Sequence, residues 1–137
     1  MQRFQSLQTE NSAVYSPPFY SWEHGYKMKL QVYPNGFGRG MGTELSVFVI
    51  ITKGEYDAIL PWPFNRIVMI TLLSQQRDKE GDLVKTVDFS DASLSSKQKP
   101  AAERTNGYGK FDFISLKTLA HSSYLVNDTI FLQVKVL

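Results

Sequence analysis

The sequence predicts an all-β fold, an antiparallel β-sandwich of seven to eight strands with at most one short helix. Three observations lead to this prediction. Some short segments alternate apolar and polar residues with the period of two that a half-buried strand requires. Other short runs are apolar at nearly every position, as in strands covered on both faces. Clusters rich in Gly, Asn, Asp, Ser and Pro separate these runs and favour turns.

The first predicted strand is residues 26–33, YKMKLQVY, in which apolar and polar residues alternate. The apolar face is formed by Tyr26, Met28, Leu30 and Val32. The polar face, which we expect to be half-exposed, is formed by Lys27, Lys29 and Gln31. The strand runs into Asn35-Gly36, a strong turn signal, and glycines at 36, 38, 40 and 42 permit repeated positive φ angles.

Two runs are apolar at nearly every position, residues 45–51 (LSVFVII) and 66–73 (RIVMITLL), which is typical of strands covered on both faces. A polar loop, residues 74–83, follows the second run. Further strands are predicted at residues 83–89 and 109–116, because both are short and rich in strand-forming residues.

The last predicted strand lies within residues 128–137, DTIFLQVKVL, and turns one set of side chains inward: Ile130, Leu132, Val134 and Val136. Gln133 and Lys135 then point outward. Only residues 115–123, SLKTLAHSS, favour a short helix, with Ser115 as its N-cap. No internal repeat or linker divides the chain, so residues 1–137 are expected to form one domain.

Composition narrows the function classes. The 137 residues are 42% hydrophobic, enough for a real core. There is no cysteine, so stability needs no oxidising compartment and a cytoplasmic location is expected. No segment resembles a secretion signal or is long enough to cross a bilayer, so direct membrane insertion is not expected. The net charge of +2 is spread over scattered lysines and arginines, which argues against nucleic-acid binding.

No pattern indicates an enzyme or a cofactor site. The two histidines, His24 and His121, are far apart and lack the spacing of metal ligands. The glycine-rich loop at residues 36–42 is followed by no lysine-threonine pair and leads into a strand, unlike a phosphate-binding loop. The serines in residues 90–96 lack a partner histidine and the glycines of a nucleophile elbow. We therefore expect no catalytic residue, no metal and no cofactor.

The segment KGEYDAILPWPF, residues 53–64, separates the two apolar runs. Its two prolines fix φ and remove backbone donors, so the chain can turn sharply between two central strands. Trp62 and Phe64 can then cover one end of the core. We expect this corner to be structural and not a ligand contact.

The chain also shows a family resemblance. It contains, in the family's order and at nearly the family's spacing, VYSPPFYSWEHGYKMKLQVYPNG, LSVFVIITKGEYDAILPWPF, LLSQ, KQKP and SSYLVNDTIFLQVKV. These segments resemble the C-terminal MATH (meprin and TRAF homology) domain of tumour necrosis factor receptor-associated factors, over about residues 14–137. The resemblance implies an eight-stranded sandwich that binds short extended peptides from receptor cytoplasmic tails and adaptor proteins in signal transduction.

In such domains the peptide adds as a strand to an exposed sheet edge, which the resemblance places at residues 106–114, NGYGKFDFI. Gly107 and Gly109 would let a partner backbone approach closely, or they only shape the turn into the strand. The resemblance implies a peptide hydrogen bond at Tyr33 and a groove contact at Gly38. It implies a lined pocket at Phe48, Ile70 and Phe89, although Phe48 and Ile70 lie in apolar strands and a core position is the competing interpretation.

Other groove positions depart from the family pattern. Gln31 replaces a common arginine, Phe37 replaces an acidic residue, and Leu94-Ser95-Ser96 interrupts a three-serine run that grips a glutamine side chain. Another branch of the family uses aromatic residues on the edge strand. Tyr108 matches one of these, while Lys110 replaces the other and would attract an acidic peptide residue.

Residues 1–12, MQRFQSLQTENS, contain neither the family's Trp-x-Ile strand nor heptads, so the family's first strand and trimer-forming coiled coil are expected to be missing. A homotrimer is expected only in a full-length, coiled-coil context. The preferred interpretation is a non-enzymatic peptide-binding adaptor module. The alternatives are a substrate-recognition domain of a ubiquitin ligase or deubiquitinase, and a structural oligomerisation domain.

Overall fold

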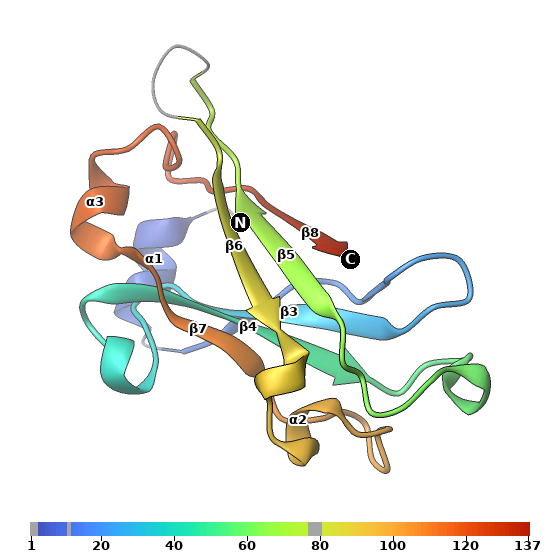
Figure 1. Ribbon diagram of the computed structural model, residues 1–137. Helices are drawn as coiled ribbons and strands as arrows, with labels where there is room; N and C mark the ends of the chain where they lie inside the picture. Colours follow the sequence, from blue (N-terminus) through green and yellow to red (C-terminus); the bar gives the residue numbers. More distant parts are fainter. Residues whose placement is uncertain (1–2, 11, 77–80) are drawn as a thin grey trace.

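The computed structural model describes residues 3–10, 12–76 and 81–137, which form an antiparallel β-sandwich (Figure 1). Its eight described strands are β1 (Val14–Tyr15), β2 (Phe19–Tyr20), β3 (Lys27–Tyr33), β4 (Glu44–Thr52), β5 (Ile67–Leu72), β6 (Leu83–Asp88), β7 (Tyr108–Ser115) and β8 (Leu132–Val136). The predicted fold class is confirmed.

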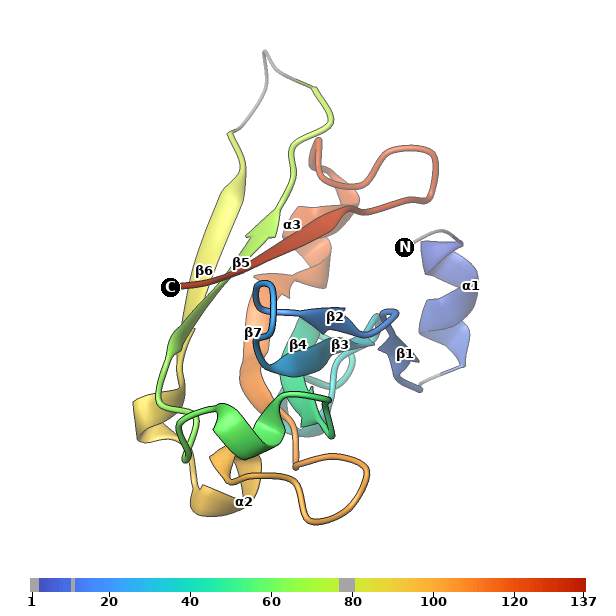
Figure 2. The same cartoon turned by 90° about the vertical axis from the view of Figure 1, so that its right-hand side faces the viewer.

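The strands form two sheets that face each other as two layers (Figure 2). The larger sheet has the order β1-β3-β4-β7, with β2 also paired to β3, and the smaller sheet has the order β6-β5-β8. All of these pairs are antiparallel. The apolar faces of both sheets bury the core between them, while β7 and β8 each lie at one edge of a sheet.

Five predicted strands agree with β3, β4, β5, β6 and β7 to within one residue at each end. The last, predicted within residues 128–137, is shorter and begins at Leu132, and the two-residue strands β1 and β2 were not predicted. The alternation predicted for β3 is confirmed on its apolar face, because Met28 is fully buried and Tyr26, Leu30 and Val32 are at most 5% exposed. The opposite face is not uniformly half-exposed as predicted. Gln31 is only 8% exposed, because side chains of neighbouring strands cover it.

The predicted helix is confirmed as α3 (Leu116–Ala120), and the Ser115 hydroxyl caps it by accepting the backbone N–H of Thr118 at 3.0 Å. The limit of one helix was wrong. The described residues contain two further α-helices, α1 (Phe4–Thr9) and α2 (Leu94–Lys97), and 3₁₀ turns at Gly38–Gly40, Asp57–Ile59 and Phe89–Asp91. Helices this short are stabilised by tertiary packing, which local sequence does not reveal.

The predicted corner is structural. The Trp62 indole donates to the carbonyl of Asp57 at 2.8 Å, and the Tyr26 hydroxyl donates to the carbonyl of Pro61. The Tyr26 ring packs edge-to-face against Trp62 and Phe64, with ring centroids 5.1 and 4.7 Å apart. The Trp62–Pro63 peptide bond is cis. These contacts close the end of the core between β4 and β5.

The middle of the predicted polar loop, residues 77–80, lies outside the described residues. Beside it, the Asp82 carboxylate accepts the backbone N–H of Ser74 at 2.7 Å. Within the described ranges, no helix is both long enough and apolar enough to cross a membrane.

Candidate functional site

The candidate site is built around β7, which pairs with β4 and with no other described strand. Its second side therefore presents unpaired backbone donors and acceptors, as edge strands do. Gly109 lies directly opposite Phe48 in the β4–β7 register. A β-bulge between Leu45 and Val47 shifts this register, which the sequence did not predict.

A hollow of about 240 Å³, here called the outer pocket, lies on the face of the larger sheet that points away from the core. It is lined by Gln31, Tyr33, Phe37, Phe48, Arg104, Gly107 and Phe111. Phe48 reaches this face because it alternates with Val47 and Val49, whose side chains lie in the core.

Aromatic rings form most of the outer pocket. The Phe48 ring packs edge-to-face against Phe111 and Tyr33, with centroids 5.2 and 6.0 Å apart. Phe37 stacks against Phe111 at 6.2 Å and lies against Tyr33 at 4.7 Å. Phe37 remains 44% exposed, so the cluster is open to solvent on one side and offers apolar surface to a ligand.

A polar network borders these rings. The Gln31 amide nitrogen donates to the hydroxyls of Tyr15 at 3.0 Å and Tyr33 at 3.3 Å. A side-chain hydrogen bond with Arg104 lowers the pKa of Tyr15 below its ordinary value. Burial raises the pKa of Tyr33. The backbone of Arg104 is held by a bridge to Thr52, which brings its side chain to the pocket.

Positively charged side chains lie at and beside the outer pocket. The Arg39 guanidinium lies 5.0 Å from the centre of the Phe111 ring, and the Lys29 ammonium lies 4.7 Å from the centre of the Tyr15 ring. Arg104 is itself a lining residue, and none of the lining residues is an aspartate or glutamate. The arrangement favours a ligand that carries an anionic group beside an apolar one.

The other face of β7 presents different residues. Tyr108 lies opposite Val49, packs against the core and meets the Phe89 ring at a centroid distance of 5.2 Å. Lys110 lies opposite Val47, so it shares this face with Tyr108. The free backbone edge of β7 therefore runs between the outer pocket and the Tyr108–Lys110 side.

The serines of α2 adjoin the start of β7. The carbonyl of Ser95 accepts the backbone N–H of Asn106 at 3.1 Å, and the Ser93 and Ser95 hydroxyls lie 3.1 Å apart. Ser95 is exposed, whereas Ser96 is 5% exposed. Of the two predicted serines, Ser95 is thus the one whose side chain is open to solvent.

The structure brings together five of the predicted residues in the outer pocket: Gln31, Tyr33, Phe37, Phe48 and Gly107. Gly38 and Gly109 adjoin it, because a Cβ on Gly38 would lie 3.1 Å from the Phe111 ring and one on Gly109 would lie 2.8 Å from the Cα of Phe48. Phe48 is 6% exposed but packs on the outer face and not in the inter-sheet core.

Ile70 and Phe89 do not line this pocket. Both are fully buried in the core, Ile70 on β5 of the smaller sheet and Phe89 between Phe64 and Tyr108. Inward-facing positions of two packed sheets are inaccessible to a peptide, so the core interpretation holds for Ile70.

Sequence reasoning missed four residues of the site, Tyr15, Arg39, Arg104 and Phe111. Arg104 is 73 positions from Gln31 in the chain, and it is brought to the pocket by pairing of residues 103–105 with the end of β4, including the bridge between Thr52 and Arg104. Phe111 lay within the predicted edge strand, but the bulge decides which face it occupies. The clustering of aromatic residues in residues 108–113 was the one available signal.

The fold and the site together define an all-β sandwich domain with an open strand edge beside an aromatic, cationic pocket. The TRAF/meprin MATH domain model matches residues 11–133. The chain belongs to this family, so the resemblance noted in the sequence is confirmed. Membership makes it a protein-interaction domain of the receptor- and adaptor-binding type.

Individual relatives agree with this assignment. The chain is 36% identical to mouse TNF receptor-associated factor 5 over 134 residues, covering 96% of this chain and 24% of that protein. It is 39% identical to human TNF receptor-associated factor 1 over 123 residues, covering 88% of this chain and 29% of that protein. The solved structure of Notothenia coriiceps TRAF5 matches with a TM-score of 0.85 and 33% identity, over 98% of this chain and 66% of that one. The chain thus spans about a quarter of the length of these curated relatives.

Proposed function

We propose that residues 1–137 act as one MATH domain, a non-enzymatic adaptor module that binds a short extended peptide by adding it as a strand to the free edge of β7. The observation that carries the proposal is the position of this edge between two differently lined faces. An added strand would point alternate side chains to the outer pocket and to the Tyr108–Lys110 side.

The lining of the outer pocket supports a particular peptide chemistry. Its rings favour an aromatic or large apolar side chain, and Arg104 favours a carboxylate. Both peptide residues must face the same side of the added strand, so they would stand two positions apart. Gly107 and Gly109 lack side chains because atoms of β3 and β4 lie where their Cβ atoms would be, so they allow β7 to pack closely beside the pocket. Ser95 is open to receive a polar side chain.

The relatives' names associate them with the tumour necrosis factor receptor. On this basis we propose cytoplasmic tails of cell-surface receptors, or adaptor proteins that bind them, as the partners. This proposal includes a cytoplasmic location, and a homotrimer in a full-length protein that contains a coiled coil. The same groove would serve a substrate-recognition role in the ubiquitin pathway if the full-length protein carried the catalytic domain.

The test is an amide NMR titration of the labelled chain with two synthetic peptides of about eight residues, a length that spans one strand. One carries Phe and Glu two positions apart, and the other carries them at adjacent positions. We expect the first peptide to shift the amides of β7 and the outer pocket and to bind more tightly than the second. Amides of β7 that neither peptide perturbs, or equal binding of both, would overturn the proposal.

A matched pair of variants separates the pocket from general charge effects. Arg104→Gln should weaken the first peptide about tenfold, because a charge-assisted hydrogen bond is lost. Lys85→Gln removes the same charge on β6 of the other sheet and should leave the affinity unchanged. A peptide containing a central Gln tests whether Ser95 contributes to recognition.

A further inference from the structure

The outer face of the larger sheet divides into an aromatic half and a basic half. Alternate residues of β3 share this face, in the order Lys27, Lys29, Gln31 and Tyr33. The last two belong to the outer pocket, whereas the two lysines line a second hollow of about 240 Å³, here called the basic hollow. Its lining residues are Ser16, Pro18, Lys27, Lys29, Thr52, Lys53, Glu103 and Arg104. Arg104 lines both hollows, so they adjoin on one face.

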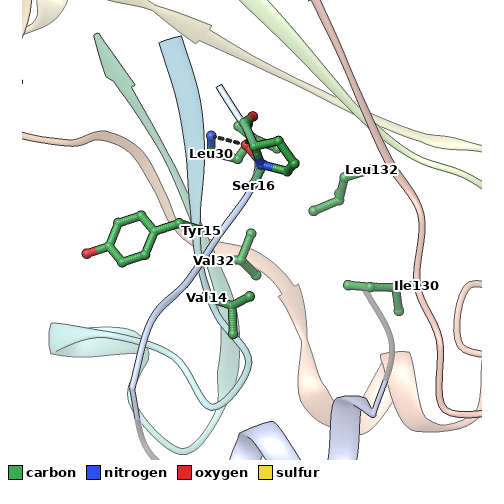
Figure 3. Close-up of a pocket in the computed structure, with 8 residues that line it drawn as sticks. Val14, Tyr15, Ser16, Leu30, Val32, Ile130 and Leu132 are labelled. Atoms are coloured by element: carbon green, nitrogen blue, oxygen red, sulfur yellow. Dashed lines mark hydrogen bonds between the residues drawn. The ribbon is translucent and has the colours of Figure 1, made fainter. Parts of the chain in front are cut away.

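Tyr15 lies between the two halves. Figure 3 shows its side chain pointing away from Val14 and from the core residue Val32, so the ring lies on the outer face of the sheet. Arg104 is the largest cause of the lowered pKa of Tyr15, and the charge of Lys29 lowers it further. The lowered pKa therefore agrees with a positive potential at this end of the sheet.

Backbone hydrogen bonds hold the lining of the basic hollow in place. The Ser16 hydroxyl accepts the N–H of Leu30 at 2.9 Å (Figure 3), and the Ser16 N–H donates to the carbonyl of Leu30 at 3.0 Å. On the other side, the Lys53 N–H donates to the carbonyl of Glu103 at 2.9 Å. The backbone of the hollow is thus fixed before a ligand arrives, which lowers the entropic cost of binding.

The side chains of the basic hollow have more donors than acceptors. Four of them are cationic, and one, Glu103, is acidic. Among the described residues, none of these four cations forms an ion pair with a carboxylate. The Thr52 hydroxyl oxygen is buried and has no hydrogen-bond partner in the described part of the chain, although buried polar atoms normally have one. The hollow is therefore suited to an anionic group with several acceptor oxygens.

We propose that the basic hollow binds a phosphate monoester, the side chain of a phosphoserine in the same peptide that occupies the outer pocket. A phosphoserine carries between about 1.5 and 2 negative charges at pH 7 and has three strong acceptor oxygens. Lysine and arginine side chains pair with such a group through charge-assisted hydrogen bonds. The inference rests on the proposed function, because the peptide must lie along the edge of β7.

The geometry of an added strand predicts the position of the phosphoserine. Residues on one face of a strand recur at every second position, about 7 Å apart. An aromatic residue in the outer pocket is then followed, two positions along, by a carboxylate at Arg104, which lies where the two hollows meet. The next residue on the same face, two positions further, would reach the basic hollow.

Peptide binding tests this spacing. One peptide places Phe, Glu and Ser at alternate positions, a second reverses their order to cover both chain directions, and each is made with and without phosphate on the serine. We expect phosphorylation to strengthen binding about tenfold for one of the two orders. Moving the phosphoserine by one position turns it to the opposite face and should remove the gain. No gain in either order, or an equal gain from the displaced phosphoserine, would overturn the proposal.

A matched pair of double variants tests the hollow itself. Lys29→Gln with Lys53→Gln removes two cations of the hollow and should reduce the gain from phosphorylation to about twofold or less, with the affinity for the unphosphorylated peptide unchanged. Lys85→Gln with Lys135→Gln removes the same charge from the smaller sheet and should leave the full gain. An equal loss in both double variants would indicate general charge attraction and would overturn the proposal.

Titration with O-phosphoserine alone separates this inference from the proposed function. At constant ionic strength it should shift the amides of Lys29, Lys53 and Arg104, whereas serine should not. If it does so while no peptide perturbs β7, the proposed function is wrong and the phosphate site stands. If the peptides perturb β7 but neither O-phosphoserine nor phosphorylation has an effect, the phosphate site is wrong. Binding to phosphatidylserine vesicles that requires Lys29 and Lys53, without a response to phosphopeptide, would identify a membrane as the ligand and would also overturn the proposal.

Discussion

Tyr15 and Gln31 lie directly opposite each other on β1 and β3, and the Gln31 amide nitrogen donates to the Tyr15 hydroxyl at 3.0 Å. This bond ties the two-residue strand β1 to the outer pocket. Arg104, from the loop before β7, acts on the same hydroxyl and lowers the pKa of Tyr15. The ionisation of Tyr15 therefore depends on both β3 and the loop before β7.

We predict that Arg104→Gln raises the pKa of Tyr15 toward its ordinary value, because the hydrogen bond with Arg104 is the largest cause of its lowered pKa. NMR titration of the tyrosine ring carbons measures this, with Lys85→Gln as the control. The lowered pKa stabilises the folded state as pH rises above the folded pKa, and the gain is complete above the unfolded value near 10. Denaturation of the variant should therefore show a greater loss of stability at such pH than at pH 7. An unchanged Tyr15 titration would contradict the prediction.

Strand positions were predictable because they depend on a local pattern. The period of two in residues 26–33 and the apolar run at 45–51 are each sufficient to indicate β3 and β4. The corner at Trp62 was likewise recognisable from its prolines and aromatic residues. These features depend on backbone conformation and side-chain periodicity within ten or so residues.

The candidate site was only partly predictable, because it depends on contacts between distant segments. The alternating pattern of residues 26–33 predicts an exposed Gln31 side chain, but in the structure Tyr15 and Gly107 cover it. The family resemblance implies that Phe89 lines a pocket, but the packing of the two sheets buries its side chain completely. No local sequence pattern identifies Arg104 as a pocket residue, because its position at the pocket depends on the backbone bridge to Thr52.

Gly109 should not tolerate a side chain. A Cβ at this position would lie 2.2 Å from the carbonyl oxygen of Val47, a backbone atom that cannot move aside cheaply. We predict that Gly109→Ala lowers the free energy of unfolding by about 1–3 kcal/mol, as overpacking typically does. Gly81→Ala is the control, because a Cβ there meets no atom within 4 Å. Chemical denaturation compares the two, and equal stabilities would show that β7 can move away from β4.

The Tyr26 hydroxyl should contribute to stability and not to peptide binding. We predict that Tyr26→Phe lowers the free energy of unfolding by about 1 kcal/mol, because the carbonyl of Pro61 loses its donor while the aromatic packing with Trp62 and Phe64 is kept. Thermal denaturation measures the change. Tyr20→Phe removes the hydroxyl from a tyrosine that is 37% exposed and should have little effect. A loss of peptide affinity in Tyr26→Phe would contradict a purely structural corner.

The short helix α1 should depend on a single anchoring side chain. Phe4 is 1% exposed within the core cluster, and its backbone N–H donates to the carbonyl of Asp128 at 3.0 Å. A helix of six residues has little stability of its own, so its formation depends on this burial. Phe4→Ala should therefore lower the free energy of unfolding by about 3–5 kcal/mol.

The same substitution separates the helix from the sandwich. We expect Phe4→Ala to abolish the protection of the α1 amides against hydrogen exchange, while the amides of β4 and β5 stay protected because those strands are central in their sheets. Gln5→Ala is the control, since the contact that residue 5 makes to Asp128 is through its backbone N–H, which alanine retains. If α1 stayed protected in Phe4→Ala, the helix would be held by contacts other than the buried ring. If β4 and β5 lost protection together with α1, the N-terminal segment would be part of one cooperative unit with the sandwich.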